Sequence, residues 1–258
     1  MRDLGAGPSL LSVNTATVRK QAGLLEIIEA CARHGIAAIS PWRDQVAAVG
    51  LERAARDDNR RAVDEAAALG APCVILVAGG LPQFARPGST PSKDLLGARK
   101  MIEDGIAELL VHARQARLPL ALEPLHPMYA ADRAAVNTLA QALDIADRLD
   151  PGGRALGVAV DVYHTWWDPD LYASIARAGR DHRLIAYHVC DWLVPTKDML
   201  NDRGMMGDGV VDLRRIRSAV EDAGYTGLIE AEIFSDHWWA QPMDVVLATC
   251  VERYRSVV

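Results

Sequence analysis

Hydrophobic and polar positions follow a repeating pattern along the whole chain. Short apolar runs recur near residues 10, 36, 73, 118, 155, 184 and 227, and each has the length of a strand that is buried on both faces. Between these runs, apolar residues return every three or four positions, which is the spacing of a helix with one buried face. The pattern therefore predicts seven strands that alternate with helices.

Start and stop residues bound several of the predicted helices. The first helix is expected to run from Val18 to His34 and to end at Gly35, since glycine readily adopts the left-handed backbone of a helix end. Asp212 caps a later helix, which stops at Gly224. The segment 191–211 shows neither a strand-length apolar run nor the apolar spacing of a helix, and it is expected to be an unusually long loop.

The alternation of strands and helices implies a parallel sheet, either closed as a barrel or open and doubly wound. No G-x-G-x-x-G follows the first strand and the chain contains no G-x-x-x-x-G-K, so a nucleotide-binding open sheet loses support. Polar residues gather instead at the carboxyl ends of the strands, where TIM barrels place their active sites. Because the composition does not shift along the chain, we expect one α/β domain over residues 1–258, a parallel (β/α)8 TIM barrel.

A closed barrel of this type needs eight strands, and the pattern supplies seven. Two helical patterns, 45–56 and 57–69, follow each other directly, and Asp57-Asp58-Asn59 has the composition of a helix start. A barrel without one interior strand would expose two unpaired edges. We therefore expect that one βα unit, belonging between about residues 56 and 57, is missing from the sequence.

Length, charge and cysteine content narrow the class of protein. A chain of 258 residues with 50% hydrophobic content can bury a large core. A formal net charge of −6 argues against nucleic acid or an anionic membrane as the partner, because both need a concentrated basic face. No apolar run approaches the roughly 18 residues of a transmembrane helix, and we see no signal peptide. The four scattered cysteines are expected to be reduced thiols in a cytoplasmic protein.

Four of the apolar runs close with a side chain that can bind a metal ion: Glu123, Asp161, His188 and Glu232. We interpret these four residues as ligands of one divalent ion. A set of carboxylates and one imidazole can bind Mn²⁺, Co²⁺, Mg²⁺ or Zn²⁺, so the ligand types do not identify the metal. Glu230 competes with Glu232, because both point to the same side of one strand. We prefer Glu232, which lies nearer the carboxyl end, and assign Glu230 to the barrel interior or to the support of a ligand.

Further polar residues follow the expected ligands closely. His126 and His164 each come three residues after one of them, within reach of a bound substrate, although a histidine that caps a loop is the plain alternative. Asp191 follows His188 at the same spacing and is expected to orient it or to contact substrate. Arg203 could bind a substrate oxygen or be a solvated loop residue.

Tryptophans lie at or near many strand ends, and we expect Trp42 and Trp166 to contact the substrate. Such a set suits stacking on a sugar ring, although core burial explains some of its members. The set consists of Trp42, Trp166, Trp167, Trp192, Trp238 and Trp239.

These motifs resemble those of the xylose isomerase-like TIM barrel superfamily of sugar isomerases and epimerases. The most specific are Glu123-Pro-Leu-His, Asp161-Val-Tyr-His, His188-Val-Cys-Asp, Asp202-Arg203 with the following Gly-Asp-Gly, and Glu232-Ile-Phe. The resemblance implies that the four strand-end residues bind one divalent ion, for which we favour Mn²⁺. It also implies that His164 and Arg203 contact substrate oxygens. In relatives, the strand unit that we expect to be missing from this sequence contributes part of the substrate pocket.

The implied chemistry is proton transfer next to a carbonyl group, through a metal-bound enediolate. Glu123 and Glu232, one on each face of the reacting carbon, could remove and return the proton. Return to the same carbon from the opposite face epimerises a sugar, and return to the neighbouring carbon converts an aldose to a ketose. We therefore predict an isomerase that acts on a small sugar or sugar derivative. We expect a homo-oligomer with no nucleic-acid or membrane partner.

Other activities remain open from the sequence. A lyase would use the same enolate to expel a leaving group, with His126 or His164 as the base. Some members of the superfamily dehydrate inososes, and others resemble the catalytic subunit of enzymes that cleave 3-oxo-C-glycosides with a small partner subunit. A non-enzymatic sugar-binding barrel is a third class. An abasic-site endonuclease would need three zinc ions, more than the 7 histidines present and a basic surface, so we discount it.

Overall fold

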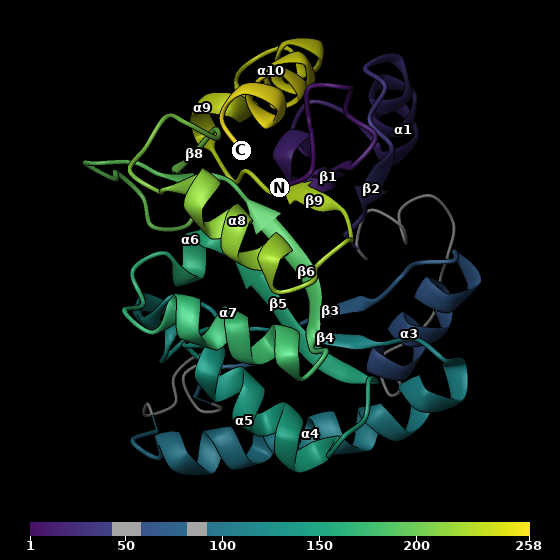
Figure 1. Ribbon diagram of the computed structural model, residues 1–258, viewed down its shortest axis with the longest axis vertical. Helices are drawn as coiled ribbons and strands as arrows, with labels where there is room; N and C mark the ends of the chain where they lie inside the picture. Colours follow the sequence, from purple (N-terminus) through teal and green to yellow (C-terminus); the bar gives the residue numbers. More distant parts are fainter. Residues whose placement is uncertain (43–57, 82–91) are drawn as a thin grey trace. The chain divides into compact units, whose positions relative to one another are not determined.

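Strands and helices alternate along the chain, as the sequence predicts (Figure 1). The computed structural model describes residues 1–42, 58–81 and 92–258. The predicted helix at 45–56 and the junction at residues 56 and 57, where a βα unit is expected to be missing, lie outside the described residues. None of the helices within the described ranges is long and apolar enough to cross a membrane.

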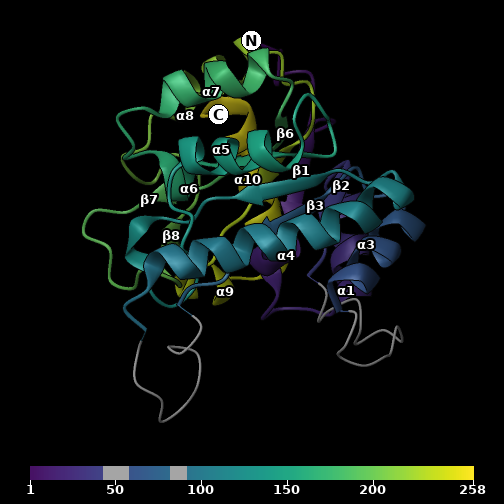
Figure 2. The ribbon, with the colours of Figure 1, turned by 90° about the horizontal axis from the view of Figure 1, so that it is seen from below.

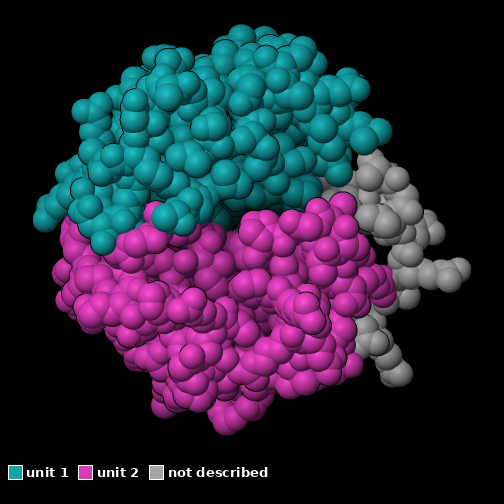
Figure 3. Space-filling model, turned by 45° about the vertical axis from the view of Figure 1, so that its right-hand side comes forward, with its two compact units in different colours: residues 1–53, 187–222, 226–258 teal, residues 54–186, 223–225 magenta. Residues whose placement is uncertain are grey.

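The chain divides into two compact units (Figure 3). Unit 1 consists of residues 1–53, 187–222 and 226–258, and unit 2 consists of residues 54–186 and 223–225. The boundary falls inside strand β6 (Leu184–Val189), so β6 gives its first half to unit 2 and its second half to unit 1.

Unit 1 contains parallel strands in the order β2-β1-β9-β6. Strand β1 (Leu11–Asn14) pairs with β2 (Ala38–Ser40) on one side and with β9 (Ile229–Ala231) on the other, and β9 also pairs with the end of β6. Every residue of β1 and β9 is buried. Burial of both faces explains why these short runs lack a strict alternation of apolar and polar residues.

Helices α1 and α10 pack against each other in unit 1, and α10 also packs against the 3-10 helix η1 (Figure 1). The helices of this unit are η1 (Thr15–Val18), α1 (Leu24–Arg33), α8 (Leu213–Asp222), α9 (Asp236–Trp239) and α10 (Met243–Ser256).

The first long helix starts later than predicted. It begins at Leu24, not at Val18, because two local structures occupy the preceding residues. Asn14 accepts a hydrogen bond from the amide of Ala16 and starts η1, which ends at Val18. Gly23 then has an extended backbone, and its amide donates to the Glu26 carboxylate at 3.0 Å. The apolar spacing alone could not reveal this cap.

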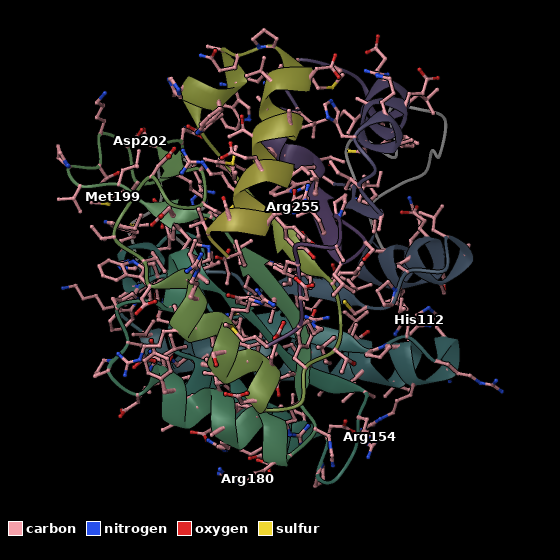
Figure 4. The ribbon with its side chains drawn as sticks, turned by 45° about the horizontal axis from the view of Figure 1, so that its top comes forward. His112, Arg154, Arg180, Met199, Asp202 and Arg255 are labelled. Atoms are coloured by element: carbon pink, nitrogen blue, oxygen red, sulfur yellow. The ribbon has the colours of Figure 1, made fainter. Side chains whose placement is uncertain are left out.

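The segment 191–211, predicted as a loop, contains a small antiparallel pair of strands. Strand β7 (Asp191–Trp192) pairs with β8 (Arg203–Gly204), and Trp192 lies opposite Arg203. Met199, between the two strands, lies at the outer edge of the segment (Figure 4) and is 56% exposed. The pairing gives Arg203 a fixed place in unit 1 that a flexible loop would not provide.

Unit 2 contains parallel strands in the order β6-β5-β4-β3. Strand β4 (Leu120–Glu123) pairs with β3 (Val74–Val77) and with β5 (Leu156–Asp161), and all residues of β4 and β5 are buried. With unit 1, this gives the seven strands that the sequence predicts, all parallel, and confirms an α/β fold consistent with a TIM barrel. Among the described residues, no eighth strand joins this parallel sheet.

Helices pack along the strands of unit 2. Helix α5 packs on β5, α7 lies beside α5, and α4 lies beside α3 (Figure 2). Small residues, Ala121, Ala159 and Ala186, form a buried cluster at the sheet. The helices of this unit are α3 (Asp58–Ala68), α4 (Leu95–Ala116), η2 (Pro127–Tyr129), α5 (Leu139–Leu149), α6 (Val162–Thr165) and α7 (Leu171–Arg180).

Candidate functional site

The predicted ligands lie at strand ends. Glu123 and Asp161 are the last residues of β4 and β5, His188 is the last but one of β6, and Glu232 directly follows β9. Each side chain is buried, with 0% to 7% of its residue surface exposed. Burial of a charged group at a strand end is costly unless the group has a partner, so these positions are candidates for function.

In unit 2, two carboxylates approach the same ring nitrogen. The Nε2 atom of His164 lies 3.7 Å from Glu123 Oε1 and 3.7 Å from Asp161 Oδ2. The other oxygen of Asp161 accepts a hydrogen bond from the amide of Tyr163 at 2.7 Å, which caps helix α6. The strand-to-helix turn therefore fixes the Asp161 carboxylate and brings His164, one turn later, next to it.

The ring of His164 has a defined orientation. Its Nδ1 accepts a hydrogen bond from the backbone amide of His126 at 3.2 Å. The ring also meets Tyr129 and Tyr163 edge to face, with centroids 6.0 Å and 5.4 Å away. Because the acceptor nitrogen of a neutral imidazole carries no hydrogen, the proton of His164 is on Nε2, the nitrogen that points to Glu123 and Asp161.

His126 is arranged in a similar way. Its Nδ1 accepts a hydrogen bond from the amide of Met128 at 3.2 Å, so its proton is also on Nε2. Its ring meets that of Trp167 edge to face at 5.6 Å, and Trp167 Nε1 donates to the carbonyl of His164 at 2.8 Å. Sequence reasoning singled out Trp166, the neighbour of Trp167. Burial lowers the pKa of His126, so the neutral form of the ring persists below the usual titration range.

In unit 1, His188 lies between two glutamates. Its Nδ1 is 3.8 Å from Glu232 Oε2, and its Nε2 is 3.9 Å from Glu230 Oε1. His188 and Glu230 are register partners on β6 and β9, so their side chains leave the sheet on the same side. Glu232 lies two residues further along and shares that side.

Sequence reasoning missed Asn14, which joins the two glutamates. Its Nδ2 donates to Glu230 Oε1 and to Glu232 Oε1, both at 2.9 Å. Its Oδ1 accepts from Trp42 Nε1 at 2.8 Å and from the amide of Ala16 at 3.0 Å. Asn14 is the last residue of β1, and this strand-end position was the signal that could have identified it.

Arg203 and Trp42, both predicted to contact substrate, lie near Glu232 and Phe234. Arg203 Nη1 donates to the Glu232 carboxylate at 3.1 Å, and its guanidinium lies 5.0 Å from the centre of the Phe234 ring. The Trp42 ring meets Phe234 edge to face at 5.4 Å and is 39% exposed. Trp42 thus supports Asn14 through its indole N–H while part of its surface stays accessible.

Asp191 organises the segment that carries Arg203. One of its carboxylate oxygens accepts from the amides of Trp192 and Val211 at 2.8 Å and 3.0 Å, and the other accepts from the amide of Gly207 at 2.9 Å. These three backbone contacts identify Asp191 as a residue that positions the segment 191–211.

Each unit contains buried side chains of types that suit a divalent metal ion. Unit 2 supplies two buried carboxylates, Glu123 and Asp161, and unit 1 supplies the imidazole of His188 and the carboxylate of Glu232. Oxygen and imidazole nitrogen donors of this kind bind first-row divalent ions. Glu232 keeps its orientation because Asn14 and Arg203 each hold one of its oxygens.

Comparison with known proteins places this arrangement in context. A family model described as xylose isomerase-like TIM barrel matches residues 11–249. The structure of protein SMc04130 from Sinorhizobium meliloti 1021 is 55% identical in sequence with a TM-score of 0.89, and the match covers 96% of this chain and 98% of that one. A search of curated proteins found no match.

Two more distant structures share the fold. The IolI protein with a bound zinc atom is 20% identical, with a TM-score of 0.75 and coverage of 96% of this chain and 97% of that one. A D-allulose 3-epimerase from Methylomonas sp. is 16% identical, with a TM-score of 0.63 and coverage of 98% and 99%.

Proposed function

This chain belongs to the xylose isomerase-like TIM barrel family, and we propose that it is a divalent-metal-dependent sugar isomerase or epimerase. Its substrate is a small sugar or sugar derivative in which a C–H group beside a carbonyl loses and regains a proton. Family membership supports a site at the carboxyl ends of the strands, because TIM barrels place their active sites there.

We assign Glu123, Asp161, His188 and Glu232 as the ligands of one divalent ion. All four are buried, and their side-chain types suit such an ion. When bound, the ion supplies the positive charge that polarises the carbonyl group and acidifies the neighbouring C–H. We favour Mn²⁺, while Co²⁺, Mg²⁺ and Zn²⁺ also suit the donors; the IolI protein of the same fold holds zinc.

The hydrogen bonds of His126 and His164 are the observation that carries the assignment of the proton transfer. In both rings a backbone amide occupies the Nδ1 lone pair, and Nε2 carries the hydrogen. A general base needs a lone pair that faces the proton it removes. To present one at Nε2, either ring would have to give up its backbone hydrogen bond, worth about 1 kcal/mol. We therefore assign the proton transfers to the carboxylates of Glu123 and Glu232.

Hydrogen-bond donors complete the proposed site. The Nε2–H group of His164 and the guanidinium of Arg203 suit substrate oxygens on which negative charge develops. The exposed part of Trp42 suits the apolar face of a sugar ring. A lyase that uses His126 or His164 as its base loses support, because neither ring offers a free lone pair at Nε2.

Isotope exchange tests the proposal. The full chain with Mn²⁺ is incubated with a panel of ketoses in D₂O and followed by NMR; we expect deuterium at C2 or C3. EDTA should abolish the exchange and added Mn²⁺ should restore it. Replacing the assigned base, Glu123→Gln, should abolish exchange, whereas His126→Ala should retain it and the exposed control Glu29→Gln should leave it unchanged.

A second substrate separates the two reaction classes. If no sugar incorporates deuterium while a 3-oxo-glycoside releases its aglycone, the protein is a lyase and the isomerase proposal is wrong. A loss of aglycone release in His126→Ala would then identify His126 as the base. Activity that survives complete removal of metal ions would contradict both reactions as described.

A further inference from the structure

Glu230 is a buried acidic residue to which the proposed chemistry gives no role. It is 9% exposed and lies on β9, beside His188 on β6 and two residues before Glu232. Strand interiors rarely contain an ionisable side chain without a reason, since burial of the charge must be offset by specific partners. The partners of Glu230 indicate what that reason is.

Two neutral donors fix the Glu230 carboxylate. The Nδ2 group of Asn14 donates to Oε1 at 2.9 Å, and the hydroxyl of Ser40 donates to Oε2. Neither donor carries a charge, and together the two hydrogen bonds hold the orientation of the carboxylate. This arrangement differs from that of Glu221 in the same unit, whose carboxylate is paired with two arginines.

Hydrogen bonds determine which way the side-chain amide of Asn14 is turned. Its Oδ1 accepts from Trp42 Nε1 and from the amide of Ala16, while the two hydrogens of Nδ2 go to Glu230 and Glu232. A flipped amide would place oxygen against two carboxylates and NH₂ against two N–H groups. One amide therefore holds both glutamates in a fixed relation.

The two glutamates face the two nitrogens of one ring. Glu232 Oε2 lies 3.8 Å from His188 Nδ1, and Glu230 Oε1 lies 3.9 Å from His188 Nε2. If Nδ1 binds the ion together with Glu232, Nε2 carries the hydrogen and points to Glu230. Histidines that bind metal ions commonly donate this second N–H to a carboxylate, which fixes the ring and raises its basicity.

We infer that Glu230 is a positioning residue that orients His188 for metal binding and, through Asn14, holds Glu232 as its partner ligand. The inference rests on the metal site proposed above and adds a role for residues outside the ligand set. It also assigns a role to Asn14, the last residue of β1, whose side chain contacts both glutamates.

Titration of the metal-free full chain with Co²⁺ tests the inference without substrate. Calorimetry gives affinity and stoichiometry, and visible absorption of the bound Co²⁺ reports the ligand field. For Glu230→Gln we expect Co²⁺ affinity to fall about 10- to 100-fold at unchanged stoichiometry, the usual effect of losing such a carboxylate. The absorption spectrum of Co²⁺ bound to Glu230→Gln should also shift, because the His188 ring becomes less basic without the carboxylate.

Further variants separate orientation from ligation and from folding. Glu232→Gln, which removes a proposed ligand, should lose measurable binding, and Asn14→Ala should weaken binding at least as much as Glu230→Gln. The exposed control Glu252→Gln should bind as the wild type does. The melting temperature of each metal-free variant shows whether it folds, and Glu230→Asp, which keeps the charge, should recover part of the affinity.

The outcomes are distinct. Wild type that binds no Co²⁺ overturns the metal site and this inference together. Wild type that binds, with Glu230→Gln equal to it in affinity and spectrum, overturns only the inference. Complete loss of binding in Glu230→Gln, with Glu232→Gln still able to bind, would make Glu230 a metal ligand and overturn its role as a positioning residue.

Discussion

Glu221 shows that a buried carboxylate in this chain can serve stability and not chemistry. Its side chain is 6% exposed and accepts hydrogen bonds from the amide and Nε of Arg2, at 2.6 Å and 2.9 Å, and from Nε of Arg217 at 3.0 Å. Burial opposes the charge, but the hydrogen bonds from Arg2 and Arg217 outweigh it and hold the pKa of Glu221 below its ordinary value of 4.5.

The lowered pKa gives a pH-dependent prediction. The folded protein binds the proton of Glu221 less tightly than the unfolded chain does, so the ionised residue stabilises the fold above about pH 4.5, and this stabilisation is lost as pH falls through the folded pKa. We expect Glu221→Gln to lower the free energy of unfolding by about 1–3 kcal/mol at pH 7. Urea unfolding from pH 7 to pH 3 should show the difference from wild type shrinking below pH 4.5. A difference that persists unchanged to pH 3 would contradict the ion-pair explanation.

The proposed ligands could be picked out from the sequence more easily than the residues that contact them. Glu123 and Asp161 end apolar runs, and a strand end needs no tertiary information to be recognised. Asn14 also ends a strand, but its role depends on β1 lying beside β9, which brings together residues more than 200 positions apart. Ser40 contacts Glu230 only because β2 flanks β1.

At the scale of elements, the segment 191–211 depends on Asp191. Three backbone amides converge on this one carboxylate, and the segment carries Arg203 on β8. A segment of this length would otherwise sample many conformations, each placing Arg203 differently. The fixed backbone keeps Arg203 within hydrogen-bonding distance of Glu232.

We expect Asp191→Asn to loosen this segment. The amide nitrogen of asparagine cannot accept a hydrogen bond, so at least one backbone N–H loses its partner, at a cost of about 1–3 kcal/mol. Thermal unfolding should show a lower melting temperature, by roughly 2–4 °C for each kcal/mol lost. Once a substrate is identified, the kcat/KM of Asp191→Asn should be about 10- to 100-fold below that of the wild type, because Arg203 is displaced. Asp104→Asn, on the exposed face of α4, serves as the control and should change neither quantity.

Helix boundaries illustrate what periodicity leaves out. The spacing of apolar residues continues from Val18 into α1, although the backbone between them forms η1 and an extended cap at Gly23. Such boundaries depend on hydrogen bonds that single residues make with the nearby backbone. These hydrogen bonds replace helical ones at only a few positions, so the apolar period does not reveal them. The loop prediction for 191–211 missed β7 and β8 for a related reason, since two-residue strands leave no period to detect.

At the scale of the molecule, the seven parallel strands could be predicted because each is a nearly continuous apolar run between helical patterns. Their order in the sheet could not be read from the runs, since it depends on pairings such as β1 with β9. The expected missing unit at residues 56 and 57 lies outside the described residues and stays a prediction.

The single-domain organisation also stays a prediction, and unfolding tests it. Because β6 belongs to both compact units, separating them would divide one strand and leave each unit with an incomplete sheet edge. We expect urea unfolding to give one transition, with the same midpoint by far-UV circular dichroism and by tryptophan fluorescence. Two transitions with separate midpoints would identify the units as independent domains.

The hydrogen-bond chain from Trp42 through Asn14 to Glu230 has a consequence for directed evolution. Each member has a matched donor or acceptor in the next, so the effect of a substitution at one position depends on the other two. Libraries that randomise position 14, 42 or 230 alone should return mostly inactive clones, because a single exchange leaves a buried partner unmatched. Joint randomisation of all three positions gives access to alternative donor and acceptor chains, so these positions are best varied together.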